Sequence, residues 1–350
     1  MREFRLRVDL ERHRLGNYAL PLGVEPNGLP EPVQGYTLTY QSSENDEEPD
    51  CYLFHVVVSH EKVKEIIDAA FTLLPSEVTP VLEIGSRDAY RSVDVYVAEE
   101  PVPLDDFLRT WYEFEEIVLE DVCLGCGANS EDPWVEIFID SWKGVAIHVP
   151  IEWREKVEAM LHGLGLEEVP ETWPEGLDKD PDVSRPREVL SLEDEESPDL
   201  DEMLLELCAR WGLTLNVDPE TNLDEGGREL GQTLWHAVVL AEPSEPDGTG
   251  ADITFWATAG SIGELDDLIG DWFDDHPEWT LRNVLAMDRV AFDERPDELA
   301  SLPYKRSAPA LHRVEIERWQ PALPEDGGGD AGLDDAPGGE GDDEPDGRRR

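Results

Sequence analysis

Residues 52–84 read YLFHVVVSHEKVKEIIDAAFTLLPSEVTPVLEI, and this stretch decides the fold class. Residues 52–58 form an apolar run that is typical of a buried strand. Apolar side chains then recur at positions 63, 66, 67, 70, 71 and 74, which is the spacing of one helical face, and Pro75 ends the helix. Residues 81–84 are apolar again. The stretch therefore predicts a strand, an amphipathic helix and a second strand.

The same kinds of pattern continue to residue 125. We predict a strand at 93–97, a helix that begins after Pro103 and a strand at 117–124. The resulting order, β-α-β-β-α-β, is the split βαβ pattern of ferredoxin-like folds. Two further strands at 134–139 and 145–149, and a helix after Pro150, complete this part of the chain. The sequence thus predicts an α+β fold whose first domain is ferredoxin-like with extra strands.

A second set of strand and helix patterns follows a proline-rich acidic stretch. A helical stripe at 200–211 ends at Gly212, and the residues after it alternate between strand patterns and one more amphipathic helix. In chain order, the predicted organisation begins with an N-terminal strand and an irregular lead-in (1–50), followed by an α+β domain (51–169). An acidic linker (170–197), a second α+β domain (198–320) and a disordered acidic tail (321–350) complete it.

The chain is strongly acidic throughout its length. It has 82 acidic and 28 basic residues, a formal net charge of −54. Ten of the acids and three of the arginines lie in 321–350, so the predicted folded part still carries −47. Two interpretations follow: a solvated acidic coat suited to a salty cytoplasm, or a surface that attracts a basic partner or cations. Salt would weaken the self-repulsion of either surface, because it shortens the Debye length.

The charge and the hydropathy pattern also exclude some classes of protein. Binding to nucleic acid needs a basic stripe. The one basic stretch has five arginines within residues 2–14, and we interpret it as an edge strand whose arginines face the acidic body. The chain has no run of about 18 apolar residues and no apolar segment typical of a secretion signal. Its four cysteines are too few for a disulfide scaffold in a chain of 350 residues. We therefore expect a soluble cytoplasmic protein with reduced thiols and no nucleic-acid or membrane partner. The sequence does not identify a cofactor.

Cys123 and Cys126 form a C-x-x-C pair, the first candidate for chemistry. Two thiolates at this spacing can chelate zinc or cycle as a dithiol. A zinc site needs two further ligands, and the chain has no second C-x-x-C pair. The alternative interpretation is two small half-buried cysteines at a strand end.

Ser261 lies in the sequence Ala-Gly-Ser-Ile-Gly (259–263), between a predicted strand and a predicted helix. This is the context of a hydrolase nucleophile elbow, and His276 and His312 follow as candidate bases. The alternative interpretation is structural, because Ser261 and Glu264 have the S-x-x-E spacing of a helix capping box.

An acidic loop at 218–229 resembles a calcium-binding loop in its spacing. Asp218, Glu220, Asn222, Asp224 and Glu229 occupy positions 1, 3, 5, 7 and 12, but position 6 is leucine where the turn of an EF-hand needs glycine. In a chain with this many acids, such spacings also arise by chance.

Three tryptophans, Trp134, Trp142 and Trp153, lie within twenty residues and next to Arg154. Aromatic residues and arginine anchor many protein interfaces, although buried tryptophans belong more often to a core. From the sequence we expect a non-catalytic protein-interaction or structural module. The alternatives are a hydrolase built on Ser261 and a metal or thiol protein built on Cys123 and Cys126.

Overall fold

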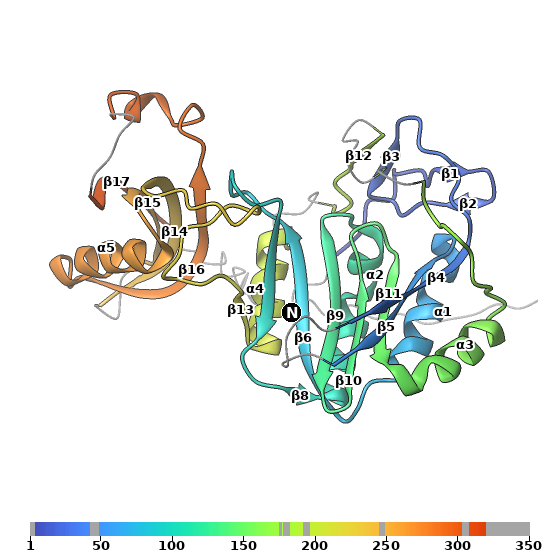
Figure 1. Cartoon of the computed structure of the whole chain (residues 1–350). Helices are drawn as coiled ribbons and strands as arrows, with labels where there is room; N and C mark the ends of the chain where they lie inside the picture. Colours follow the sequence, from blue (N-terminus) through green and yellow to red (C-terminus); the bar gives the residue numbers. More distant parts are fainter. Residues whose placement is uncertain are drawn as a thin grey trace, which may run out of the picture.

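The computed structural model describes residues 4–42, 49–174, 177, 183–191, 197–244, 249–302 and 308–319. The predicted tail at 321–350 lies outside the described residues, as do residues 175–176, 178–182 and 192–196 of the predicted linker. The described residues form two main β-sheets, and on one face of the larger sheet lie several helices, on one face of the smaller a single described helix (Figure 1). The α+β class predicted from the sequence is therefore confirmed.

The larger sheet has nine strands among the described residues, and its paired strands are antiparallel. Its spatial order is β13-β7-β6-β9-β10-β11-β5-β4, with β8 also paired to β6. The strands are β4 (Gly35–Gln41), β5 (Cys51–Val57), β6 (Glu77–Gly85), β7 (Val93–Ala98), β8 (Val102–Pro103), β9 (Leu124–Glu131), β10 (Trp134–Ile139), β11 (Val145–Pro150) and β13 (Leu213–Leu215).

Four α-helices contribute to the core of the large sheet. They are α1 (His60–Phe71), α2 (Leu104–Glu120), α3 (Arg154–Gly163), which follows a short 3₁₀ turn (Ile151–Trp153), and α4 (Leu200–Trp211). Along each strand, every second side chain points toward the helices. These side chains pack against the apolar faces of the helices and form one continuous core. Phe71, Phe107 and Trp111 lie at its centre, where the ring of Phe71 contacts the other two edge to face.

The ferredoxin-like detail of the prediction is not confirmed. In that fold the first strand of the pattern lies between the third and the fourth. Here the first strand is β5, the third is β7 and the strand after the second helix is β9. It is β6, the second strand, that lies between β7 and β9, while β5 lies beyond β10 and β11. The strand predicted at 117–124 is wrong, because α2 continues to Glu120. Ile117, Val118 and Leu119 are all buried at the end of this helix, so their apolar run mimics a buried strand.

The smaller sheet has four described strands in the order β16-β14-β15-β17. They are β14 (Thr233–Pro243), β15 (Ala251–Ala259), β16 (Trp279–Val290) and β17 (Ala310–Arg318). Helix α5 (Ile262–Asp275) packs on one face through Leu265 and Ile269, which join a separate core with Phe255 and Trp235. The predicted second unit begins at residue 198, yet α4 and β13 belong to the core and the sheet of the larger part.

Short paired strands lie over one end of the large sheet. They are β1 (Arg14–Leu15) with β2 (Tyr18–Ala19), and β3 (Val24–Pro26) with β12 (Ser184–Pro186). The strand predicted near the N-terminus is reduced to a bridge between Leu6 and Leu190. Arg12 and Arg14 form ion pairs with Glu120 and Glu61, which tie the N-terminal segment to the helices of the body.

A buried ion pair joins the two sheets. Arg289 on β16 donates from Nε to both carboxylate oxygens of Asp88, at 2.8 and 3.0 Å, and Asp88 lies between β6 and β7. The side chains are only 2% and 0% exposed. Nη1 of Arg289 also donates to Oδ1 of Asn222 and to the carbonyl oxygen of Leu223. One guanidinium thus connects three segments that are distant in the sequence.

Candidate functional site

The helices cover one face of the large sheet, and the other face carries side chains that belong to none of the hydrophobic cores formed by the described residues. We call this the open face. Its residues alternate with the core residues along each strand. They are Val93, Val95 and Val97 on β7, Thr79, Val81 and Glu83 on β6, Gly125, Gly127 and Asn129 on β9, Trp134, Glu136 and Phe138 on β10, Ala146 and His148 on β11, and Leu53 and His55 on β5.

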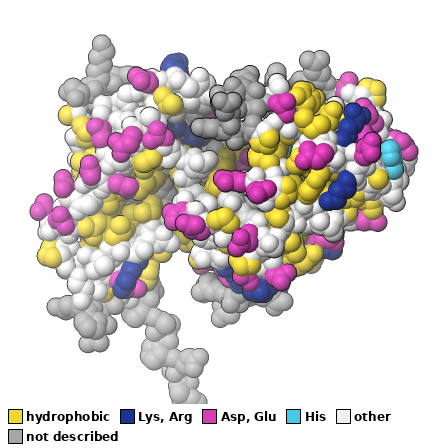
Figure 2. Space-filling view, turned by 60° about the horizontal axis from the view of Figure 1, so that its bottom comes forward, with side chains coloured by type: hydrophobic (Ala, Val, Ile, Leu, Met, Phe, Trp, Pro, Cys, Tyr) yellow, Lys and Arg dark blue, Asp and Glu magenta, His cyan; other side chains and the backbone are white. Residues whose placement is uncertain are grey.

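The strand register arranges the open face in rows across the sheet. One row is apolar: Val97 pairs with Val81, and beyond Gly127 come Phe138 and Ala146. Acidic groups and histidines border this row. Glu83 and Glu136 lie two residues away from it along β6 and β10, His148 lies two residues away along β11, and His55 pairs with Ala146 at its end. Figure 2 shows hydrophobic side chains on the surface with many acidic and few basic side chains among them. The open face is thus apolar at its centre and acidic beside it.

Gly125 is required by the close approach of Phe138. A Cβ atom at Gly125 would lie 2.9 Å from Cζ of Phe138 and 3.2 Å from a carboxylate oxygen of Glu83. The ring therefore lies over the glycine, as aromatic side chains do when they shield a glycine in a sheet. The absence of a side chain on β9 at this point lets Phe138 and Glu83 approach each other across it.

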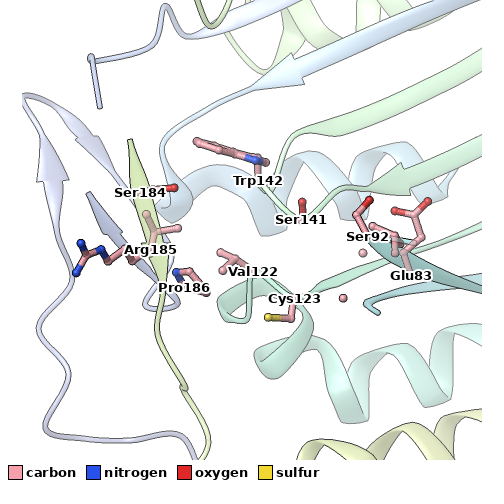
Figure 3. A pocket seen from close by; sticks show the side chains of 13 residues that line it. Glu83, Ser92, Val122, Cys123, Ser141, Trp142, Ser184, Arg185 and Pro186 are labelled. Atoms are coloured by element: carbon pink, nitrogen blue, oxygen red, sulfur yellow. The ribbon is translucent and has the colours of Figure 1, made fainter. Parts of the chain in front are cut away.

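A cavity of about 290 Å³ opens where the open face meets the pair β3 and β12 (Figure 3). Glu83 and Gly125 belong to its sheet wall, Trp142 comes from the turn between β10 and β11, and Cys123 from the turn before β9. The hydroxyl groups of Ser92, Ser141 and Ser184 also line it. The cavity is therefore largely apolar, with one carboxylate and several hydroxyls.

Glu83 is the carboxylate of this cavity, and no residue in the described part of the chain supplies a cation to it. Burial raises its pKa, and the neighbouring carboxylates of Asp140 and Glu136 raise it further. Among the described residues, no hydrogen bond or ion pair reaches its side chain. Arg185, the basic residue of the wall, directs its guanidinium away from Glu83 (Figure 3).

The two predicted cysteines do not share a site. Cys126 is fully buried in the core on the helix side of the sheet, and burial raises its pKa to about 12. Cys123 is exposed as a whole residue but its sulfur is partly buried at the cavity wall; this burial, and then the nearby Asp121, raise the pKa of the thiol. The raised pKa of each thiol opposes formation of the thiolate that zinc binding and dithiol exchange require.

Lys143, which follows Trp142 in the sequence, is a buried residue near this site. Its side chain is 2% exposed, and Nζ donates to the carbonyl oxygen of Leu124 at 2.6 Å. Burial lowers its pKa to about 8, although the carboxylates of Asp121 and Asp140 act against this. Its backbone is left-handed with φ of 63°, in the turn that Asp140 closes by accepting from the amides of Lys143 and Gly144. Lys143 therefore holds the turn that carries Trp142.

Ser261 begins α5 as a cap. Its Oγ accepts from the amide of Glu264 at 3.1 Å, and the residue is 5% exposed. The carboxylate of Glu264 returns to the amide of Gly260 at 2.7 Å, one residue earlier than in the predicted capping box. Of the two candidate bases, Nδ1 of His276 lies 2.7 Å from the carbonyl oxygen of Trp272, and Nε2 of His312 lies 2.7 Å from Oγ1 of Thr258.

The acidic loop uses its oxygens for its own structure. Asn222 is buried and binds Arg289, Gly231 and Thr233. Asp224 accepts from the amides of residues 226 and 228, and Asp218 accepts from the amide of Glu220. Glu229 forms a backbone bridge with Leu223. Within the described part of the chain, no group of three or more His, Cys, Asp or Glu side chains is arranged to hold a metal ion.

The predicted tryptophan and arginine residues are spread over three places. Trp134 stacks on His148 on the open face, and Trp142 lines the cavity and contacts Trp173 edge to face. Trp153 packs at the margin of the core, while Arg154 bonds to Glu158 on α3 and lies over the ring of Tyr52. Only Trp134 and Trp142 therefore belong to the open face and its cavity.

Comparison of the chain with protein-family models, with curated proteins and with solved structures finds no match. No helix in the described part of the chain is both long enough and apolar enough to span a bilayer. Interpretation of the site therefore depends on its own geometry.

Proposed function

We propose that this chain is a non-catalytic protein-binding module that holds a basic partner segment on the open face of the large sheet. The observation that carries the proposal is the apolar row of Val97, Val81 and Phe138, which no described core covers, next to the unpaired carboxylate of Glu83. Contiguous apolar surface bordered by polar groups is typical of protein interaction sites.

The charge of the open face defines the chemistry of the partner. Glu83 and Glu136 project from the strands of the open face, and Asp140 lies at the end of β10. The whole chain carries a net charge of −54, so an acidic protein would be repelled and a basic one attracted. We therefore propose a partner segment in which lysine or arginine alternates with aliphatic or aromatic residues.

A selection of random peptides displayed on phage against the immobilised protein tests this function. We expect the enriched peptides to combine basic and apolar residues, and a synthetic peptide from the selection to bind in solution. Replacing Val81 and Val97 by serine should weaken its binding by about tenfold or more, because two apolar contacts are lost. Leu281→Ser is the matched control, since Leu281 is 42% exposed on β16 of the other sheet.

Two results would contradict the proposal. The first is a selection that enriches no peptide above the unselected library. The second is a peptide whose affinity falls equally in the Leu281→Ser control and in the double variant, because binding would then not depend on the open face. Thermal melts of all variants establish that each is folded.

A further inference from the structure

We propose that the cavity between Glu83 and Trp142 binds an organic cation, either an alkylammonium or a guanidinium group. This inference builds on the proposed function, because the cavity opens at one end of the open face. It adds a chemically defined subsite to that face, and the subsite can be tested without the partner.

The walls of the cavity suit a cation that has an apolar stem. Val93, Val122 and the indole of Trp142 supply apolar and aromatic surface. Aromatic rings attract cations, tryptophan most strongly, and apolar walls remove competing water. Ser92 and Ser141 add hydroxyl oxygens that can accept from N–H groups. A volume of about 290 Å³ accommodates a side chain of the size of lysine or arginine.

The electrostatics of the cavity call for a positive charge. A half-buried carboxylate is costly unless it is paired, and no described residue pairs with Glu83. Asp140 and Glu136 add negative potential near it. The basic Arg185 of the wall points away (Figure 3). A bound ammonium or guanidinium would supply the partner that the described residues do not give Glu83.

A metal ion fits this cavity less well than an organic cation. Calcium and magnesium take six or more oxygen ligands, and zinc takes four nitrogen, sulfur or oxygen ligands. The described residues form no cluster of three or more metal-binding side chains, and the cavity contains a single carboxylate, that of Glu83. A single carboxylate with apolar and hydroxyl neighbours instead matches a monovalent cation with a carbon stem.

The test is an NMR titration of the full chain with n-butylammonium and with n-butylguanidinium, at an ionic strength kept constant with sodium chloride. We expect saturable shifts of the amide resonances of Ser92, Val93 and Gly125, and no such shifts with n-butanol. In Glu83→Gln the affinity should fall by about tenfold or more, because a charge-assisted contact is lost. Glu136→Gln is the matched control, since it removes the same charge from the same face outside the cavity wall.

A second variant keeps the test decisive if Glu83→Gln is unstable. Val93→Phe places a larger side chain in the cavity wall, at a residue that is 40% exposed, and should abolish the shifts while Glu83 remains. The inference is overturned if neither cation shifts these resonances, or if the affinity is unchanged in Glu83→Gln and in Val93→Phe.

Two further arms separate the sources of the cation. If N-acetyl-lysine or N-acetyl-arginine methylamide binds as well as the butyl compounds, the subsite accepts a side chain of a protein partner. If the free butyl compounds bind and the amides do not, it is a small-molecule site. The subsite can fail while selected peptides still need Val81 and Val97, so its failure and the failure of the proposed function give different results.

Discussion

Asp88 and Arg289 show how much one residue pair contributes to the arrangement of the two sheets. We predict that Asp88→Asn destabilises the protein by about 3–5 kcal/mol, because the guanidinium of Arg289 would stay buried without its counter-charge. Urea unfolding of the variant measures this loss. Glu242→Gln is the control: the Arg282–Glu242 pair has side chains that are 58% and 48% exposed, and its loss should cost at most about 1 kcal/mol. Equal effects of the two substitutions would contradict the assigned role.

The side chain of Asp288 makes the stability of the protein depend on pH. Burial, followed by the carboxylates of Asp94 and Asp88, raises its pKa to about 6, and Arg87 and Arg91 act in the opposite direction. The native state therefore binds this proton more tightly than the unfolded chain does. The stabilisation from Asp288 is complete below about pH 4 and is lost as the pH rises through about 6.

Asp288→Asn should remove this loss. At pH 7.5 we expect the variant to be more stable than the unmodified chain by about 2 kcal/mol, and the difference should vanish below about pH 4. Denaturant unfolding at several pH values measures it. Asp271→Asn, at an exposed position of α5, is the control that removes one carboxylate from the surface. A variant that is less stable at pH 7.5 would refute the predicted sign.

At the scale of the elements, α5 depends on its cap. Ser261→Ala should destabilise the protein by about 1 kcal/mol, because the amide of Glu264 loses its acceptor. Ser261→Asp should retain most of the stability, since aspartate is an equally good cap. Thermal melts compare the two, and hydrolysis of a p-nitrophenyl ester is measured in parallel. Ester turnover that disappears in a folded Ser261→Ala protein would favour the hydrolase hypothesis over the cap.

Most elements could be predicted from the sequence, but their order in the sheet could not. Apolar periodicity identified α1, α4 and α5, because each helix buries one stripe of side chains. It failed at 117–124, where the end of α2 is buried on several sides. The positions of β5, β6 and β9 within the large sheet depend on pairing between segments that are distant in the sequence. The local pattern of apolar residues carries no information about that pairing.

The candidate site could be predicted only in part, for a similar reason. The C-x-x-C pair points to Cys123, and the grouping of three tryptophans within twenty residues points to Trp142. Glu83 and Ser92 were missed, since one acid or one serine among many carries no local signal. Glu83 does interrupt an apolar strand at 81–84, and a carboxylate in such a place points to an outward face. Glu83 and Trp142 line the same cavity only because of the order of the strands in the sheet and the conformation of the turn that Lys143 stabilises.

At the scale of the whole molecule, the net charge of −54 sets the response to salt. Self-repulsion weakens the compact state, and raising KCl from 0.1 to 3 M shortens the Debye length from about 10 Å to below about 3 Å. We therefore expect the melting temperature to rise by about 5 °C or more over this range. Differential scanning calorimetry measures the change.

The same experiment separates bulk salt from specific ion sites. At fixed ionic strength, micromolar zinc, submillimolar calcium and a chelator should leave the melting temperature unchanged. The thiol of Cys126 is buried away from Cys123, and oxygens of Asn222 and Asp224 already accept hydrogen bonds within the protein. A rise with calcium would identify residues 218–229 as a binding loop, and a rise with zinc would identify Cys123 as a ligand. Either rise would contradict the prediction that the acidic surface responds to salt only as a diffuse charge.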